Sequence, residues 1–203
     1  MNNYNLGYAC INKNFSERSK KQRITTNRGM IRRTFLEKGL PYVSELALAN
    51  CQDLLKILQW NAKQDIHFFR MSSGLFPWGS EYAFEDLPDY EVIAETLFEC
   101  GLFAEEHDIR ITTHPDHFNK LTSPKESVIL NTIKDLELHG RMFDLLCLPR
   151  SPYAKINIHV GAAYDDKPMA LDNFCKNFQR LSEAVKTRLT VENDDKPSLY
   201  TTE

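Results

Sequence analysis

Short apolar runs alternate with longer helical stretches along this chain, and that order constrains its fold more than any other feature. Five runs of five or six residues read as strands, at 6–11, 66–70, 108–113, 155–160 and 188–192. Helical spacing of apolar residues fills the stretches between them, from about 27 to 58 with a break near 39–41, then at 89–107, 124–146 and 168–184. Four strand–helix units followed by a fifth strand predict a parallel sheet with helices outside it.

The turn after the first strand decides between two kinds of parallel-sheet fold. A dinucleotide-binding fold would have a glycine-rich turn there, but the sequence is Ile11-Asn12-Lys13-Asn14. We therefore expect an α/β chain of the TIM-barrel type, with residues 1–203 in one domain. A closed barrel of eight such units takes roughly 250 residues. A length of 203 residues with five strands predicts a barrel that is truncated after strand five.

Composition excludes several classes of protein. Twelve Phe, eight Tyr and two Trp supply too much apolar area for a disordered chain. No apolar run is long enough to cross a bilayer, and the first residues lack the features of a secretory signal, so we expect no membrane partner. The five cysteines are far apart and form no CxxC pair. That spacing favours buried thiols in a reducing, intracellular compartment (cytoplasm or nucleoid) over disulfides or a structural zinc site.

Charge is distributed unevenly along the chain. The segment 13–38 contains nine Lys/Arg and two Asp/Glu, a balance of +7, so the rest must contribute −10 to the net charge of −3. A basic segment on an acidic body suits a polyanion such as nucleic acid, although charge runs are also common on solvated faces. The acidic remainder could hold metal ions.

Three successive strands end in a side chain that can bind a metal. Side chains alternate across a strand, and the polar phase of the third, fourth and fifth strands leads to His114, His159 and Glu192. Active sites of βα barrels lie at these carboxyl ends. Two imidazoles and a carboxylate there predict a divalent-metal site, with zinc, manganese and iron all compatible. Each residue alone could instead be a hydrogen-bonded histidine or an ion-paired glutamate.

Other polar residues reach the same rim. They are Tyr8 and Asn12 after the first strand, Arg70, Ser72 and Ser73 after the second, and Asn193, Asp194 and Asp195 after the fifth. Turn chemistry explains Ser, Asn and Asp at such places equally well. We interpret the remaining histidines, His67, His107 and His139, as structural.

These motifs together resemble the UV damage endonucleases, in the family's order and over nearly the whole chain. The blocks are Leu-Gly-Tyr-Ala-Cys-Ile-Asn at 6–12, Thr-Thr-Asn-Arg at 25–28, Phe-Arg-Met-Ser-Ser-Gly-Leu-Phe-Pro at 69–77, His-Pro-Asp-His-Phe at 114–118, His-Val-Gly-Ala-Ala-Tyr-Asp-Asp-Lys at 159–167 and Glu-Asn-Asp-Asp at 192–195. The resemblance implies a barrel related to endonuclease IV and xylose isomerase, with divalent metals, commonly Mn²⁺ and alternatively Zn²⁺ or Mg²⁺. It also implies UV-damaged double-stranded DNA as substrate, cut immediately 5′ of a photoproduct to leave a 3′-hydroxyl.

The resemblance also implies roles for individual residues. His114, His159 and Glu192 match metal ligands and would carry catalysis. Tyr8 and Asn12 match residues that probe the damaged duplex.

DNA contacts would come from further residues. Arg28 in the basic segment and Arg70 at the second strand are expected to contact the DNA. The family usually has Gly-Gln and an aromatic residue after its His-Pro, as a wedge into the duplex. Here Asp116, His117 and Phe118 stand there, and Phe118 can still stack or intercalate.

Two other functions fit the same fold. A metal-dependent sugar isomerase or epimerase would use the metal site but leave the aromatic wedge and the basic segment without a purpose. A non-catalytic or partner-requiring barrel fragment would bind duplex DNA without nicking it, unless a second chain supplied the missing strands and ligands.

Overall fold

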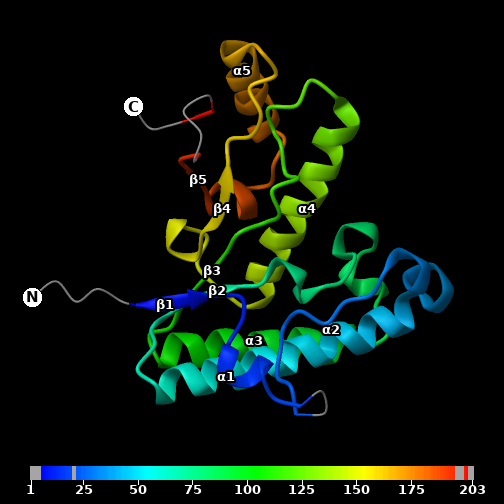
Figure 1. Cartoon of the computed structure of the whole chain (residues 1–203), viewed down its shortest axis with the longest axis vertical. Helices are drawn as coiled ribbons and strands as arrows, with labels where there is room; N and C mark the ends of the chain where they lie inside the picture. The colour runs from blue at the N-terminus through cyan, green and yellow to red at the C-terminus, as the bar shows by residue number, and fades with distance from the viewer. Residues whose placement is uncertain (1–5, 20–21, 195–198, 201–203) are drawn as a thin grey trace, which may run out of the picture. The chain divides into compact units, whose positions relative to one another are not determined.

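The computed structural model describes residues 6–19, 22–194 and 199–200. Its strands are β1 (Gly7–Ala9), β2 (Phe68–Met71), β3 (Arg110–Thr113), β4 (Ile156–His159) and β5 (Leu189–Glu192). Hydrogen bonds join them in the order β1-β2-β3-β4-β5, and β1 with β2, β3 with β4 and β4 with β5 pair in parallel (Figure 1). The parallel α/β sheet expected from the sequence is confirmed.

Helices connect the strands in the expected alternation. They are α1 (Lys13–Ser16), α2 (Arg32–Lys63), α3 (Tyr90–Glu106), α4 (Glu126–Leu145), α5 (Lys167–Phe178) and α6 (Glu183–Lys186). Single 3₁₀ turns at 73–75, 79–81, 84–86 and 152–154 lie in the loops. Among the described residues, no helix combines the length and apolar character that crossing a membrane requires.

The chain forms two compact units. The first comprises the described residues of 1–112 with 145–148, and therefore β1, β2, α1, α2, α3 and most of β3. The second comprises the described residues of 113–144 and 149–203, and therefore nearly all of α4 together with β4, α5, α6 and β5.

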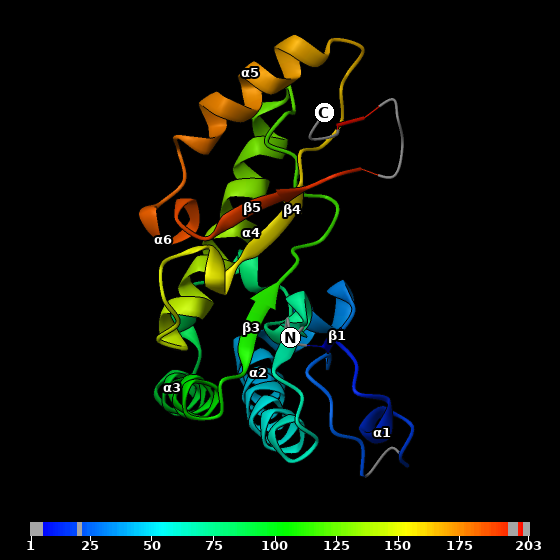
Figure 2. The ribbon, with the colours of Figure 1, turned by 90° about the vertical axis from the view of Figure 1, so that its left-hand side faces the viewer.

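In the first unit, α2 and α3 lie side by side (Figures 1 and 2). Buried residues recur on each helix at intervals of three or four, at Val43, Ala47, Cys51, Leu54 and Leu58 on α2 and at Ile93, Leu97, Cys100 and Ala104 on α3. That spacing places them on one face of each helix, and their burial drives the packing. Only glycine fits at position 101, because a Cβ there would lie 1.8 Å from the carbonyl oxygen of Leu146.

The predicted break in the long helix α2 is confirmed at Gly39. Its φ of 61° and ψ of −160° leave the helical region, in a conformation that glycine adopts without strain, and Pro41 follows inside the helix. The expected start near residue 27 was wrong, since α2 begins at Arg32. The residues before Arg32 are held by side chains of α2 instead of by helical hydrogen bonds. The backbone N–H of Thr25 donates to Asp53, and that of Arg28 donates to Asn50.

In the second unit, β4 and β5 pair along their length, with α4 beside them (Figure 2). Ile156 and Ile158 are buried, whereas Asn157 and His159 are only half-buried, as the alternation of a strand requires. The expected helix over 168–184 is instead two helices, α5 and α6. At the break between them, the backbone N–H of Ser182 donates to the Glu137 carboxylate at 2.7 Å.

Arg188 is the largest fully buried side chain of the second unit. Its guanidinium donates to Asp144 Oδ1 at 2.8 Å and to the carbonyl oxygens of Pro149, Gly140 and Ala184 at 3.1 to 3.3 Å. Asp144 also pairs at the surface with Arg150, at 2.7 Å. These bonds satisfy the buried guanidinium and hold Arg188, the residue before β5, against α4.

We predict that Asp144→Ala destabilises the protein by about 3–5 kcal/mol, because it leaves the buried Arg188 charge without its counterion. Chemical denaturation followed by circular dichroism measures this change. The matched control is Arg150→Ala, which removes the exposed partner of the same carboxylate and should leave the free energy of unfolding nearly unchanged. Equal losses in both variants would contradict the role given to Arg188.

The same ion pair predicts a dependence on pH. Burial alone would raise the pKa of Asp144, but hydrogen bonds from Arg150 and Arg188 lower it below its ordinary value. Its stabilising contribution is therefore complete above the pKa of the unfolded chain and is lost as the pH falls through the lower folded pKa. The melting temperature of Asp144→Asn should fall less steeply with acid than that of the parent protein.

Candidate metal centre

His114, His159 and Glu192 converge at the carboxyl ends of the strands in the second unit. His114 follows β3 directly, whereas His159 and Glu192 are the last residues of β4 and β5. The Nε2 atoms of His114 and His159 lie 2.9 and 3.1 Å from the same carboxylate oxygen, Glu192 Oε1. One possible ligand atom from each residue lies within 4.8 Å of the others.

Strand pairing brings these side chains together. β4 and β5 are paired with Asn157 opposite Thr190 and His159 opposite Glu192. Because these positions alternate with the buried Ile156 and Ile158, both pairs project from the same face of the sheet. The sequence expectation of three strand-end ligands is met in its geometry; their role as ligands remains a prediction.

Asn157 fixes the orientation of the Glu192 carboxylate. Its amide donates a hydrogen bond to Glu192 Oε2, while both histidine contacts are to Oε1. Thr190 Oγ1 in turn donates to Asn157 Oδ1 at 2.7 Å. One carboxylate oxygen is thus held by the sheet, while the other remains directed at both imidazoles.

The other nitrogen of each imidazole lies close to an oxygen atom. His114 Nδ1 lies 3.0 Å from the carbonyl oxygen of Pro115, which can only accept, so Nδ1 donates this hydrogen bond and Nε2 is the nitrogen that can bind a metal. His159 Nδ1 lies 3.2 Å from Asp194 Oδ1, at ion-pair distance but without the alignment of a hydrogen bond. A histidine whose Nδ1 faces a carbonyl or carboxylate is the usual arrangement behind a metal ligand.

This donor set fits a divalent cation. A cation between these groups would accept a lone pair from both Nε2 atoms and from Glu192 Oε1. Burial alone would raise the pKa of Glu192, but hydrogen bonds from His114 and Asn157 and the charges of the two imidazoles lower it, so the carboxylate is ionised. Imidazole nitrogen and carboxylate oxygen suit zinc, manganese and iron alike.

In the first unit, Tyr8 and Asn12 are linked to α2. Asn12 Nδ2 donates to the Tyr8 hydroxyl at 2.9 Å, and that hydroxyl donates to Asn61 Oδ1 at 2.7 Å. Burial raises the pKa of Tyr8, which therefore stays protonated. The other amide atoms of Asn12 and Asn61, and Nε of Arg70, are buried without a partner among the described residues. These orphaned groups would be satisfied by a polar ligand.

Arg28 is occupied inside the protein. Its guanidinium donates to Asp53 Oδ2 at 2.6 Å and to the carbonyl oxygens of Thr25 and Arg23 at 2.6 and 3.3 Å. It thereby holds the loop before α2, and a DNA contact by Arg28 remains a prediction. Lys20 and Lys21 of the basic segment, and Asp195 after β5, lie outside the described residues.

Phe118 is an aromatic side chain presented to solvent. It is 70% exposed, and its ring lies 4.1 Å from that of His117. His117 Nδ1 lies 2.6 Å from Asp116 Oδ1, which also accepts from the His117 backbone N–H. An exposed aromatic ring suits stacking on a base; its use as a wedge remains a prediction.

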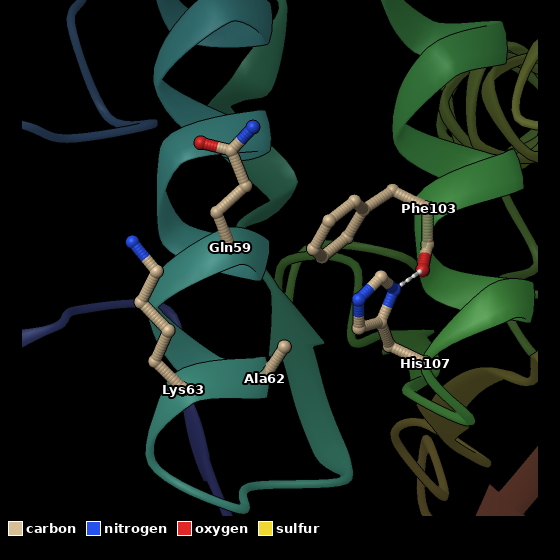
Figure 3. A pocket seen from close by; sticks show the side chains of 5 residues that line it. All are labelled: Gln59, Ala62, Lys63, Phe103 and His107. Carbon is tan, nitrogen blue, oxygen red and sulfur yellow. Dashed lines mark hydrogen bonds between the residues drawn. The ribbon is translucent and has the colours of Figure 1, made fainter.

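The other histidines do not belong to this cluster of three. His107 stacks on Phe103 at 3.9 Å, and its Nδ1 lies 3.0 Å from the Phe103 carbonyl oxygen (Figure 3). They border a cavity of about 500 Å³ with Gln59, Ala62 and Lys63 of α2. His67 contacts Asp65 at 2.9 Å, and His139 is buried, with Nδ1 3.4 Å from Thr113 Oγ1.

From the sequence, Asp194 was expected at the same rim but without a specific partner, and Asn157 was assigned no role at the centre. The spacing of these residues could have identified them. Asn157 precedes His159 by two residues and Asp194 follows Glu192 by two, and side chains two residues apart on a strand point to the same face. Turn chemistry explained Asp194 equally well at that stage.

Comparisons with known proteins agree on one family. A family model described as UV-endonuclease UvdE matches residues 4–203. The UV-damage endonuclease of Schizosaccharomyces pombe is 38% identical over 194 residues, which cover 94% of this chain and 31% of that protein. The UV DNA damage endonuclease of Clostridium perfringens is 34% identical over 192 residues, 94% of this chain and 43% of that protein. The chain thus spans less than half the length of these relatives.

A solved structure extends the similarity to the fold. The crystal structure of SacUVDE matches with a TM-score of 0.76 and 31% sequence identity. The match covers 85% of this chain and 57% of that one.

We predict that Asp194→Ala lowers the affinity for Mn²⁺ by about tenfold to a hundredfold, because His159 loses the carboxylate behind its ring. Isothermal titration of the metal-free protein measures the affinity. Asp172→Ala, which removes an exposed carboxylate of α5, is the matched control and should bind Mn²⁺ like the parent. Unchanged affinity in Asp194→Ala would refute the positioning role.

Proposed function

This chain belongs to the UvdE family of UV-endonucleases, and we propose that it acts as a metal-dependent DNA repair endonuclease on UV-damaged double-stranded DNA. The reaction is hydrolysis of the phosphodiester immediately 5′ of a photoproduct, with addition of water and release of a 3′-hydroxyl for repair synthesis. The observation that supports it most is the convergence of His114, His159 and Glu192 on one point. We propose Mn²⁺ as the ion, with Zn²⁺ and Mg²⁺ as alternatives.

The chain's own residues build and hold the centre. His114 and His159 offer Nε2 lone pairs, and Glu192 offers Oε1. Asn157 restrains the far oxygen of Glu192, and Asp194 lies behind the ring of His159. A divalent ion bound there would supply the positive charge that neutralises a phosphodiester and acidifies water.

Recognition of damage rests on deformation of the duplex in this proposal. A photoproduct weakens stacking, so a damaged site costs less to open than an intact one. Phe118 would enter the opened stack, and Tyr8 and Asn12 would offer polar groups to the displaced nucleotides. Discrimination by deformability explains how one site could accept several kinds of lesion.

The first test is nicking of UV-irradiated plasmid against untreated plasmid, with Mn²⁺ or with EDTA. We expect Mn²⁺-dependent nicking of irradiated plasmid that falls by at least about a hundredfold in Glu192→Gln, since even residues behind metal ligands cost 10 to 100-fold. His67→Gln, which substitutes a histidine of the first unit, is the control that should nick like the parent.

Each alternative function has its own outcome in this assay. Equal nicking of both plasmids would remove the lesion specificity. Salt-sensitive duplex binding without nicking at any metal concentration would favour a non-catalytic fragment, or one that needs a second chain. Turnover of a sugar without either effect on DNA would favour the isomerase or epimerase.

We predict that Phe118→Ala weakens binding to an irradiated duplex by about tenfold, as loss of one stacking contact typically costs about 1–3 kcal/mol. The measurement is fluorescence anisotropy with EDTA present, on irradiated and untreated duplexes. Tyr153→Ala removes another exposed aromatic ring of the same unit and should change neither affinity. An equal loss in both variants would argue against a specific role for Phe118.

A further inference from the structure

A polar cavity of about 980 Å³ lies within the first unit, bordered by the segments 11–18 and 23–29 and by α2. Its volume is at the upper end of the range for ligand sites in proteins. Its charged lining consists of three arginines and one glutamate, namely Arg18, Arg23, Arg28 and Glu17. The chemistry of the cavity therefore depends on which of these charges the protein already uses.

Arg28 is not available to a ligand as a free charge. Asp53, whose side chain is only 4% exposed, accepts from the Arg28 guanidinium at 2.6 Å and from Lys56 at 2.8 Å. The Asp53 carboxylate also accepts from the backbone N–H of Thr25. These bonds hold Arg28 in place. The positive charge that a ligand in the cavity could use therefore comes from Arg18 and Arg23.

Arg18 and Arg23 are oriented but unpaired. The Nε of Arg18 donates to the Asn14 carbonyl oxygen, and the Nε of Arg23 donates to that of Ser16, both at 3.1 Å. The guanidinium of Arg18 also lies over the ring of Phe15, 4.7 Å from its centre. Among the residues that the structure describes, no carboxylate is within ion-pair distance of either arginine, and the Nη atoms of both remain without a hydrogen-bond acceptor.

We propose that this cavity binds a backbone phosphate of the DNA strand, and that the guanidinium groups of Arg18 and Arg23 donate hydrogen bonds to its oxygens. When the Nε atom of a guanidinium is held by a hydrogen bond, its two Nη atoms are oriented and can donate to two oxygens of one phosphate. Tyr42 adds an aromatic wall, and Lys38 Nζ lies 3.9 Å from the centre of that ring. The wall gives the adjoining sugar or base a surface to pack on.

This subsite rests on the proposed function, because that function supplies the polyanion. A free nucleotide or inorganic phosphate would offer the same phosphate chemistry. A strand is the better match because a cavity of this volume is much larger than one phosphate group and has the ring of Tyr42 in its lining.

The test is anisotropy of a labelled, undamaged duplex between about 50 and 200 mM NaCl, with EDTA present. We expect the double variant Arg18→Gln/Arg23→Gln to bind at least about tenfold more weakly at the lower salt. Its plot of log affinity against log salt should be less steep by about one, because the contact with one phosphate is lost. Unchanged affinity and slope would overturn the subsite.

Arg150→Gln/Arg180→Gln is the matched control. It removes the same two charges from arginines of the second unit that are paired with Asp144 and Glu126. An equal loss in the control would mean that net charge alone matters, and would also overturn the subsite. Melting temperatures of all variants exclude unfolding as the cause.

Competition distinguishes a strand from a free ligand. Unlabelled oligonucleotide should displace the probe at far lower concentration than a mononucleotide or inorganic phosphate does. Equal potency of the mononucleotide would overturn the assignment to a strand.

The binding assay does not depend on the metal or on damage. Binding that depends on the two arginines, without any nicking, would therefore support the subsite and contradict the proposed function. Nicking of irradiated plasmid, with DNA binding that is unchanged in the arginine variant, would support the proposed function and contradict the subsite.

Discussion

The register between β4 and β5 is the constraint on which the candidate centre depends. It places His159 opposite Glu192 and, two residues earlier, Asn157 opposite Thr190. A slip of one residue in either strand would turn its polar side chains to the opposite face, because side chains alternate with a period of two. The burial of Ile156 and Ile158 prevents that slip, so packing of apolar residues fixes the geometry of the polar ones.

Much of this arrangement could be predicted from the sequence because it follows from short-range periodicity. The strand phases identified His114, His159 and Glu192 as neighbours, since parallel strands present their carboxyl ends at one edge. The break in α2 was equally local: Gly39 adopts a positive φ that other residues rarely tolerate, and Pro41 follows it.

The rest depends on contacts between residues far apart in the chain, which no local pattern shows. All the arginines of the basic segment look alike in the sequence. Arg28, however, is paired with Asp53, 25 residues later, whereas the Nη atoms of Arg18 and Arg23 have no acceptor among the described residues. The late start of α2 has the same origin, because Asp53 and Asn50 bind the backbone of the preceding loop. Likewise, Asp194 reads as a turn residue until the fold brings it to His159.

The central claim is that His114, His159 and Glu192 together bind one divalent cation. Crystals of the protein soaked in MnCl₂, with diffraction recorded on both sides of the manganese absorption edge, test it directly. We expect an anomalous peak within coordination distance of both Nε2 atoms and of Glu192 Oε1. A fully occupied manganese site elsewhere, with no peak among these three residues, would contradict it.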